Sequence, residues 1–205
     1  MRGDRFSREK RHPPRETNMS TSARDALGHV AIVDYDPAWP ARFQQERARL
    51  LALPGVAFDE FEHVGSTAVP GLAAKPTIDM MASVEHLDDV TAFLGRLEAA
   101  GYQLIDVGFT NRLFLRKAAD AQPVSFHLHI VLRSAWAFAN ERILRDHLIA
   151  NPDVAAAYGA LKASLAAQFA DDSPAYTAAK TAFIQQAVDT ARTKLGLPRV
   201  DVWEN

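Results

Sequence analysis

Cysteine is missing from this chain of 205 residues. Without thiols the protein has no disulfide framework, no zinc ribbon, no cysteine-bound iron–sulfur cluster and no thiolate nucleophile. Any metal would therefore need carboxylate, imidazole or carbonyl ligands. No apolar run approaches the roughly 18 residues of a membrane span, and no early segment has the apolar core of a secretory signal. We therefore expect a cytoplasmic protein without a membrane partner.

The charge is unevenly placed along the chain. Residues 1–19 hold six basic and three acidic side chains, although the whole chain has a formal charge of −2. The remainder is therefore acidic, which argues against nucleic acid as the main ligand. Residues 1–28 contain few apolar side chains, so we expect a disordered basic tail there.

Hydrophobic periodicity and turn residues predict a single domain that begins near residue 29. A helix is expected after Asp36-Pro37, and a second helix is expected to end at Gly101. The predicted strands cover residues 57–64, 77–84, 102–107, 112–117 and 124–132. The pattern is helical alone from residue 135 to 196, with helix starts at Asn151-Pro152 and Ser173-Pro174, and a short tail is expected over 197–205.

These elements predict an α+β fold. We expect a small mixed β-sheet flanked by helices over residues 29–134 and a helical C-terminal segment of the same domain over 135–196.

The densest group of unusual residues lies between His63 and Asp79 (HVGSTAVPGLAAKPTID). A strand that ends in Gly65-Ser66 presents backbone N–H groups and a hydroxyl to an anion, as phosphate binding requires. Asp79 lies in an apolar strand, where a carboxylate must be paired, hydrogen-bonded or metal-bound. We therefore interpret Asp79 as a functional residue; the alternative is a structural acceptor for the preceding loop.

The segment GSTAVPGLAAKPTID resembles the signature of the GrpB family, a branch of the nucleotidyltransferase superfamily. The resemblance covers roughly residues 30 to 192, including the His127-Leu-His129 strand. It implies a nucleotidyltransferase-like fold in which Gly65-Ser66 opens the site. A similar domain occurs attached to dephospho-coenzyme A kinases, where an accessory or folding role has been suggested.

The chain departs from the superfamily's metal chemistry. Two-metal nucleotidyl transfer needs two carboxylates at positions i and i+2 of a strand and a third from a neighbouring strand. Asp79 supplies the first carboxylate, but Met81 occupies position i+2, and its thioether does not bind Mg²⁺. His127 and His129 lie where the third is sought, on one face of their strand, and imidazole suits Zn²⁺ better than Mg²⁺.

Two readings of this departure stay open. In the first, Asp79 and one or both of His127 and His129 form a general acid–base or single-metal centre, with His63 as a further candidate. The metal ligands are then Asp79 and His129, and the cation is Mg²⁺, Mn²⁺ or Zn²⁺. In the second, the histidines only donate hydrogen bonds within a packed sheet; for His63 this structural role is the favoured reading.

Basic residues on separate elements form a third candidate group. If they converge above the glycine–serine turn, they would bind a nucleoside triphosphate or another polyanion. The predicted ligand-binding residues are Gly65, Ser66, Thr67, Lys75, Arg112, Arg116 and Lys180. Further basic candidates are Lys117, Arg145 and Lys162, whereas Tyr158 and Tyr176 are expected in the core.

Three functions follow from these residues. The first is binding of a nucleotide or phosphorylated small molecule, with transfer of a nucleotidyl group. The second is a catalytically silent module of the same fold that recognises a ligand or a partner protein. The third is a metal-dependent hydrolase built on Asp79 and His129. All three require Ser66, Asp79 and His129 to open into one hollow ringed by positive side chains.

Overall fold

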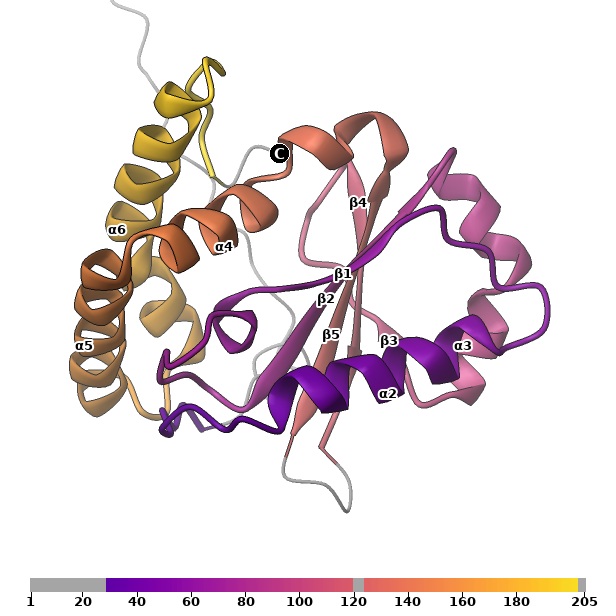
Figure 1. Cartoon of the computed structure of the whole chain (residues 1–205). Coiled ribbons are helices and arrows are strands. Elements are labelled where there is room, and N and C mark those ends of the chain that lie inside the picture. Colours follow the sequence, from indigo (N-terminus) through magenta and orange to yellow (C-terminus); the bar gives the residue numbers. More distant parts are fainter. Residues whose placement is uncertain (1–28, 120–123, 203–205) are drawn as a thin grey trace, which may run out of the picture.

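The computed structural model describes residues 29–119 and 124–202. The predicted tail over residues 1–28 lies outside the described residues, as do residues 203–205. The described chain forms a five-stranded mixed β-sheet with helices on both sides, and its last third is helical (Figure 1). The predicted fold class, a small mixed sheet flanked by helices with a helical C-terminal segment, is therefore confirmed.

The sheet brings together strands that are distant in sequence. Its order is β1-β2-β5-β4-β3, with β2 and β5 parallel and the other neighbours antiparallel. The bounds are β1 Phe61–Val64, β2 Thr77–Val84, β3 Gln103–Leu104, β4 Arg112–Lys117 and β5 Ser125–Leu132. Because parallel neighbours need a long crossover, the chain makes α3 and the β3–β4 pair between β2 and β5.

The helices divide into two groups. The α-helices are α2 Trp39–Leu51, α3 Leu94–Ala99, α4 Asn140–Ala150, α5 Pro152–Gln168 and α6 Ser173–Lys194. Short 3-10 helices are η1 Ser66–Ala68, η2 Leu87–Ala92 and η3 Arg133–Phe138. In Figure 1, α2 and α3 lie on one side of the sheet, and α4, α5 and α6 lie on the other.

Several boundaries differ from the sequence predictions. β2 and β4 match at both ends, but β1 is shorter than predicted and β3 has two residues. The first helix begins at Trp39, because Asp36 accepts a hydrogen bond from the Ala38 backbone N–H (2.8 Å) and so closes a turn before the helix. The helix predicted before Gly101 is split into η2 and α3.

The two faces of the sheet have different chemistry. Ile78, Met80 and Ala82 of β2 are fully buried in the main core, which also contains Phe43 and Leu50 of α2. The opposite face presents the intervening residues of β2, which are Asp79, Met81 and Ser83, beside His127, His129 and Val131 of β5. The polar side chains of β2 and β5 thus share the face on which the C-terminal helices lie.

The C-terminal helices are tied to the rest of the fold by buried polar contacts. Arg192 of α6 is buried and donates hydrogen bonds to the Phe138 carbonyl (3.0 Å) and to Asn140 Oδ1 (2.9 Å). Near the other end of α6, the Val30 N–H donates to the Ala170 carbonyl (2.7 Å). In the part of the chain described, no helix combines the length and the apolar character needed to cross a bilayer.

A buried carboxylate joins α2 to the neighbouring elements on the core side. Glu46 is 6% exposed and accepts hydrogen bonds from Tyr102 Oη (2.9 Å) and from the Arg49 guanidinium (2.6 and 2.9 Å). Burial alone would raise the pKa of Glu46, but these donors and the nearby Lys117 ammonium hold it below its ordinary value. The carboxylate is therefore charged and fully engaged in the folded protein.

Replacing Tyr102 with Phe should lower the free energy of unfolding by about 1–2 kcal/mol, because a buried charge loses one donor while the ring packing stays. Urea denaturation measures the change. Tyr35→Phe is the matched control, since the Tyr35 ring packs edge-on against Trp39 (5.3 Å) and its hydroxyl has no hydrogen bond among the described residues. Equal losses in both variants would contradict a role for the Tyr102–Glu46 hydrogen bond.

Candidate functional site

A carboxylate–imidazole pair lies on the polar face of the sheet. Asp79 of β2 is directly opposite His127 of the parallel strand β5, so both side chains point to the same face. Asp79 Oδ1 is 3.0 Å from His127 Nδ1. The two side chains are 27% and 20% exposed, so the pair is sheltered and still open to solvent.

The charge of Asp79 fixes the tautomer of His127. Burial alone would raise the pKa of Asp79, but the His127 hydrogen bond and the nearby imidazoles of His129 and His63 hold it below its ordinary value. An ionised carboxylate only accepts hydrogen bonds, so Nδ1 of His127 carries the proton and donates it. In the neutral ring, Nε2 is then the nitrogen with the lone pair.

Gly65 holds the carboxylate in place by close approach. Its backbone has φ +71° and ψ −171°, a region that essentially only glycine occupies. A Cβ built on Gly65 would lie 2.3 Å from Asp79 Oδ2 and 2.9 Å from Asp79 Cβ. The glycine of the predicted turn is therefore required because the turn backbone lies directly against the side chain of Asp79.

The pair opens into a cavity of about 200 Å³ between the sheet and the helices α5 and α6, which we call the Asp79 cavity. Strand β2, the loop before it and α6 supply most of its wall. Its lining residues are Ser66, Ala74, Lys75, Thr77, Asp79, His127, Lys162, Ser173, Tyr176, Thr177 and Lys180.

Three lysines line the Asp79 cavity and face one carboxylate. Lys162 Nζ lies 4.7 Å from the centre of the Tyr158 ring and donates a hydrogen bond to the Ala73 carbonyl (2.6 Å). Lys180 Nζ lies 4.4 Å from the centre of the Tyr176 ring. These cation–π contacts hold the ammonium groups at the cavity wall.

Burial and mutual repulsion act on the charges of these lysines. Burial lowers the pKa of Lys162 to about 7, and the Lys180 charge adds to this effect. Burial also lowers the pKa of Lys180 to about 8, with a contribution from Lys75. The pKa of Lys75 is lowered by burial and by the charge of Arg116. Asp79 opposes the shift at each lysine but does not cancel it, so the cavity carries excess positive charge near neutral pH.

The predicted turn residues have distinct roles. Ser66 lines the cavity, and its hydroxyl is hydrogen-bonded to the buried hydroxyl of Tyr158. Thr67 is buried instead, and its hydroxyl donates to the Thr77 carbonyl (2.9 Å) while accepting from His63 Nε2 (3.0 Å). The expectation that Thr67 contacts a ligand is therefore corrected, because both of its hydrogen-bonding positions serve the loop itself.

His63 has a structural role, which is the reading favoured from the sequence. Its ring stacks on Phe43 of α2 (4.9 Å between centroids, 12° between planes), on the face of the sheet opposite Asp79. Burial lowers the pKa of His63 to about 4, so the ring is neutral near pH 7.

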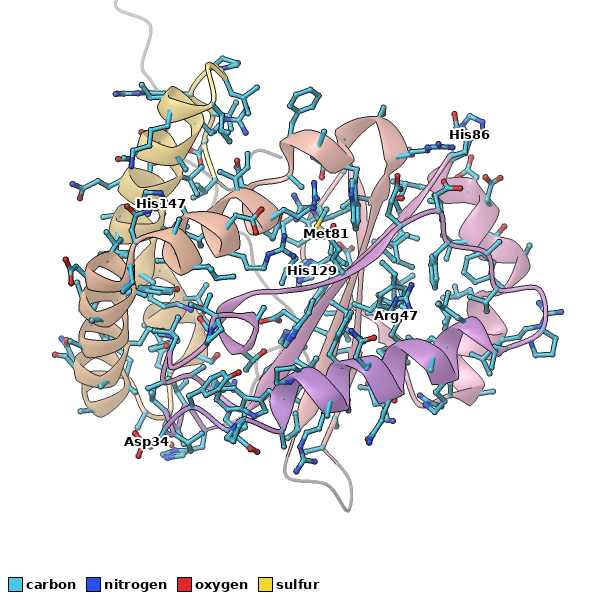
Figure 2. All side chains as sticks on the ribbon, in the orientation of Figure 1. Asp34, Arg47, Met81, His86, His129 and His147 are labelled. Carbon is cyan, nitrogen blue, oxygen red and sulfur yellow. The ribbon has the colours of Figure 1, made fainter. Side chains whose placement is uncertain are left out.

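The structure does not bring His129 into the Asp79 cavity. His129 is two residues farther along β5 than His127 and lies opposite Met81. Figure 2 shows the side chains of His129 and Met81 beside each other. Its ring contacts Phe114 (4.9 Å), and burial lowers its pKa to about 4. His127 therefore takes the place that the sequence reading gave to His129, because the register of the parallel strands pairs Asp79 with His127.

Three predicted arginines also lie outside the lining of the cavity. Arg112 is buried and forms an ion pair with Glu141 at the start of α4, outside the Asp79 cavity. Arg116 is opposite His127 on β4; its charge acts on Lys75, so it borders the cavity without lining it. Arg145 braces α4 to β1 through hydrogen bonds to Glu62 Oε2 (2.7 Å) and to the His63 carbonyl (2.8 Å).

The donor set does not fit a two-metal centre. Met81 is fully buried with Val64, Val131 and Trp136, so it belongs to the core. Within residues 29–119 and 124–202, no group of three or more His, Asp or Glu side chains is placed to hold a metal ion. His129 does not line the cavity beside Asp79, and the lysines around Asp79 repel a bare cation, so neither observation favours the predicted Asp79–His129 metal pair. The cavity therefore gives no support to the predicted metal-dependent hydrolase.

Sequence reasoning did not assign Ser173 and Thr177, which add hydroxyl groups to the cavity wall. With Tyr176 and Lys180 they occupy one face of α6, at spacings of three and four residues. The same spacing relates Tyr158 to Lys162 on α5. Polar residues that recur at helical spacing beside a buried tyrosine are therefore the sequence signal that could have identified these cavity residues.

This chain is similar to known proteins in both sequence and structure. A sequence profile described as GrpB protein matches residues 29–190. The crystal structure of conserved protein GrpB from Enterococcus faecalis is similar to this chain, with a TM-score of 0.73 and 32% identity, and the match covers 81% of this chain and 99% of that one.

Longer proteins also contain a similar region. The UPF0157 protein YqkA of Bacillus subtilis is 32% identical over 164 residues, which cover 80% of this chain and 47% of YqkA. A dephospho-CoA kinase of Mycolicibacterium paratuberculosis is 30% identical over 196 residues, covering 83% of this chain and 47% of the kinase. The chain thus spans about half the length of both relatives.

Gly65→Ala should destabilise the fold by about 3 kcal/mol or more, because it adds an overlap with Asp79 to the strain of a positive φ. Thermal unfolding measures the loss. Gly71→Ala is the matched control, since Gly71 has φ +78° and open space where its Cβ would be, which leaves a cost of about 1–2 kcal/mol. Similar losses at the two glycines would refute the close contact between Gly65 and Asp79.

Lys162 should make the protein more stable as pH rises. Its pKa is about 7 when folded and about 10.4 when unfolded, so between these values the unfolded chain binds more protons and the free energy of unfolding increases with pH. Urea denaturation at pH 7, 8 and 9 in phosphate-free buffer measures the slope, which Lys162→Met should flatten. The exposed control Lys194→Met should keep the slope of the unaltered protein. Identical slopes for all three proteins would contradict the low pKa of Lys162.

Proposed function

The chain belongs to the GrpB family, and on that premise we propose that its Asp79 cavity binds the phosphate groups of a nucleotide or another phosphorylated small molecule. One observation carries the proposal. Lys75, Lys162 and Lys180 converge from three separate elements on a cavity that contains a single carboxylate. Such a cluster is electrostatically costly without an anion, and a bound phosphate removes that cost.

The size of the cavity limits which part of a ligand enters it. At about 30 Å³ for each molecule of liquid water, 200 Å³ corresponds to about seven waters. Pockets that enclose whole drug-sized ligands are larger, at about 300–1,000 Å³. We therefore assign the cavity to the phosphate end of the ligand, with the remainder outside its mouth.

The hydroxyl groups of the wall complement the lysines. Ser173 and Thr177 line the same cavity and can donate hydrogen bonds to phosphate oxygens, and the Ser66 hydroxyl, which is bonded to Tyr158, lines it as well. Gly65-Ser66 opens η1, but with three residues this turn is too short for a helix dipole to contribute, so the side chains supply the attraction.

Transfer of a nucleotidyl group is the finer part of the proposal, and it comes from the family resemblance. Because the described residues do not form a two-metal centre, a divalent cation such as Mg²⁺ or Mn²⁺ would reach the cavity bound to the ligand's phosphates. The protein's own contribution would be to hold the phosphates with its lysines and to position His127 against them.

A second function is favoured by Met81. This buried thioether occupies the position of the second metal-binding carboxylate, as expected for a fold that has kept its binding cavity and lost transfer chemistry. The similarity to about half of a dephospho-CoA kinase supports an accessory module that recognises a ligand or a partner protein. Release of pyrophosphate from nucleoside triphosphates would separate transfer from silent binding.

Inorganic phosphate and nucleoside triphosphates, each with and without Mg²⁺ or Mn²⁺, should give binding heats in isothermal titration calorimetry. Bound phosphate should raise the pKa of Lys162 and Lys180 from about 7 and 8, so binding at pH 8 should take up protons. Titrations in buffers of different ionisation enthalpy measure this uptake. Affinity should fall as pH rises from 7 to 9, because the lysines lose their charge.

Lys180→Gln should weaken phosphate binding about tenfold or more, through loss of one charge-assisted hydrogen bond. Lys194→Gln is the matched control, because Lys194 is exposed in the last turn of the same helix and should bind as the unaltered protein does. Heats equal to dilution for every phosphate compound would remove the proposed function.

A further inference from the structure

We propose that Nε2 of His127 is a nucleophile that takes a phosphoryl group from a phosphoanhydride or similarly activated donor held in the Asp79 cavity, forming N-phosphohistidine. The inference rests on the proposed binding of phosphate and goes beyond it, because it assigns a covalent step to one nitrogen of one side chain. The established chemistry of the superfamily relies on metal ions, and this step uses only residues of the chain.

The first support is the position of the proton on the ring. Nδ1 of His127 is occupied by its 3.0 Å hydrogen bond to Asp79 Oδ1. Nε2 has no hydrogen-bond partner anywhere in residues 29–119 and 124–202, and the ring lines the cavity. A molecule in the cavity therefore meets the nitrogen that bears a lone pair, which is the form of imidazole that attacks phosphorus.

The second support is that the surrounding structure holds the His127 ring in one orientation. His127 is in the middle of the sheet on β5, and its ring contacts the Phe114 ring edge-on (5.1 Å, 77°). Asp79 is itself held by the backbone of Gly65, since the site of a Cβ on that glycine overlaps the carboxylate. The base of the cavity thus fixes both the tautomer and the direction of Nε2, as an orienting residue does for an activated nucleophile.

The third support is that three other nucleophiles of the wall are already engaged. The Ser66 hydroxyl is bonded to Tyr158, the Thr77 hydroxyl to Ser125 (2.9 Å), and Lys162 Nζ to the Ala73 carbonyl. Space for about seven waters also suits a phosphoryl donor alone better than a donor together with an acceptor molecule. These facts favour direct attack by His127 over its action as a base on a second substrate.

The step balances without a metal, an oxidant or a reductant. The lone pair of Nε2 forms the N–P bond while the bond from phosphorus to the leaving oxygen breaks, and the leaving oxygen keeps the electron pair. The Nδ1 proton stays in the hydrogen bond to Asp79, whose negative charge stabilises the positive ring. Lys75, Lys162 and Lys180 offset the charge of the phosphoryl oxygens.

Phosphoramidate tests the proposal, because it transfers a phosphoryl group to histidine with ammonia as the leaving group and needs no knowledge of the natural donor. The full chain is incubated with phosphoramidate, and mass spectrometry of peptides prepared at alkaline pH locates the acid-labile phosphoryl group. We expect His127 to be labelled at least about tenfold faster than exposed His29, and inorganic phosphate to slow labelling of His127 alone.

Three variants separate the roles of the residues. His127→Gln should abolish labelling at this position, whereas the control His29→Gln should label His127 at the unaltered rate. Asp79→Asn should slow labelling about tenfold or more, because the amide no longer holds the proton on Nδ1. The ¹⁵N chemical shifts of the His127 ring should report the tautomer change, which a purely structural role of Asp79 would not produce. Circular dichroism verifies folding of each variant.

Calorimetry with inorganic phosphate keeps the two proposals distinguishable. Phosphate binding retained in His127→Gln, together with loss of its label, supports the nucleophile. If the unaltered protein binds phosphate but His127 is labelled no faster than His29, His127 is not a nucleophile and phosphate binding stands. That is also the result expected if His127 acts as a general base. Absence of phosphate binding overturns the proposed function, and the nucleophile with it.

Discussion

Asp79 lies between two fully buried residues of β2, Ile78 and Met80. The free energy needed to shelter its charge constrains the strands and side chains around it. Burying an unpaired carboxylate costs several kcal/mol, so it must have a donor on its own face of the sheet. The hydrogen bond from His127 meets that need, and it requires β2 and β5 to be parallel and in one particular register. A slip by one residue would turn His127 to the opposite face.

The same charge links the sheet to the helices. Asp79 favours the charged forms of Lys75, Lys162 and Lys180, which would otherwise be still harder to bury. One carboxylate cannot neutralise three ammonium groups, so the cavity is left cationic. Stability and binding therefore oppose each other at this point: the residues that attract an anion are the ones whose charges the fold tolerates least.

The sequence is a good guide to the fold and to one half of the site. The alternation of apolar residues predicts β2 and β4 at both ends, and the glycine–serine turn with the strand carboxylate correctly marks the polar end of β2. The choice between His127 and His129 could not be made in this way, because it depends on the register between strands 48 residues apart in sequence. Arg112 was assigned to the ligand for the same reason, since only the tertiary structure places Glu141 beside it.

The walls of the Asp79 cavity come from segments that lie far apart in the sequence. Its floor belongs to β2 and β5, whereas Tyr176, Thr177 and Lys180 belong to α6, which ends at Lys194. During synthesis on the ribosome, the complete sheet therefore leaves the exit tunnel well before the cavity can close. Until α6 docks through Arg192, the cavity lacks Tyr176, Thr177 and Lys180, so it acquires its full positive charge only after residues 173–194 have been made.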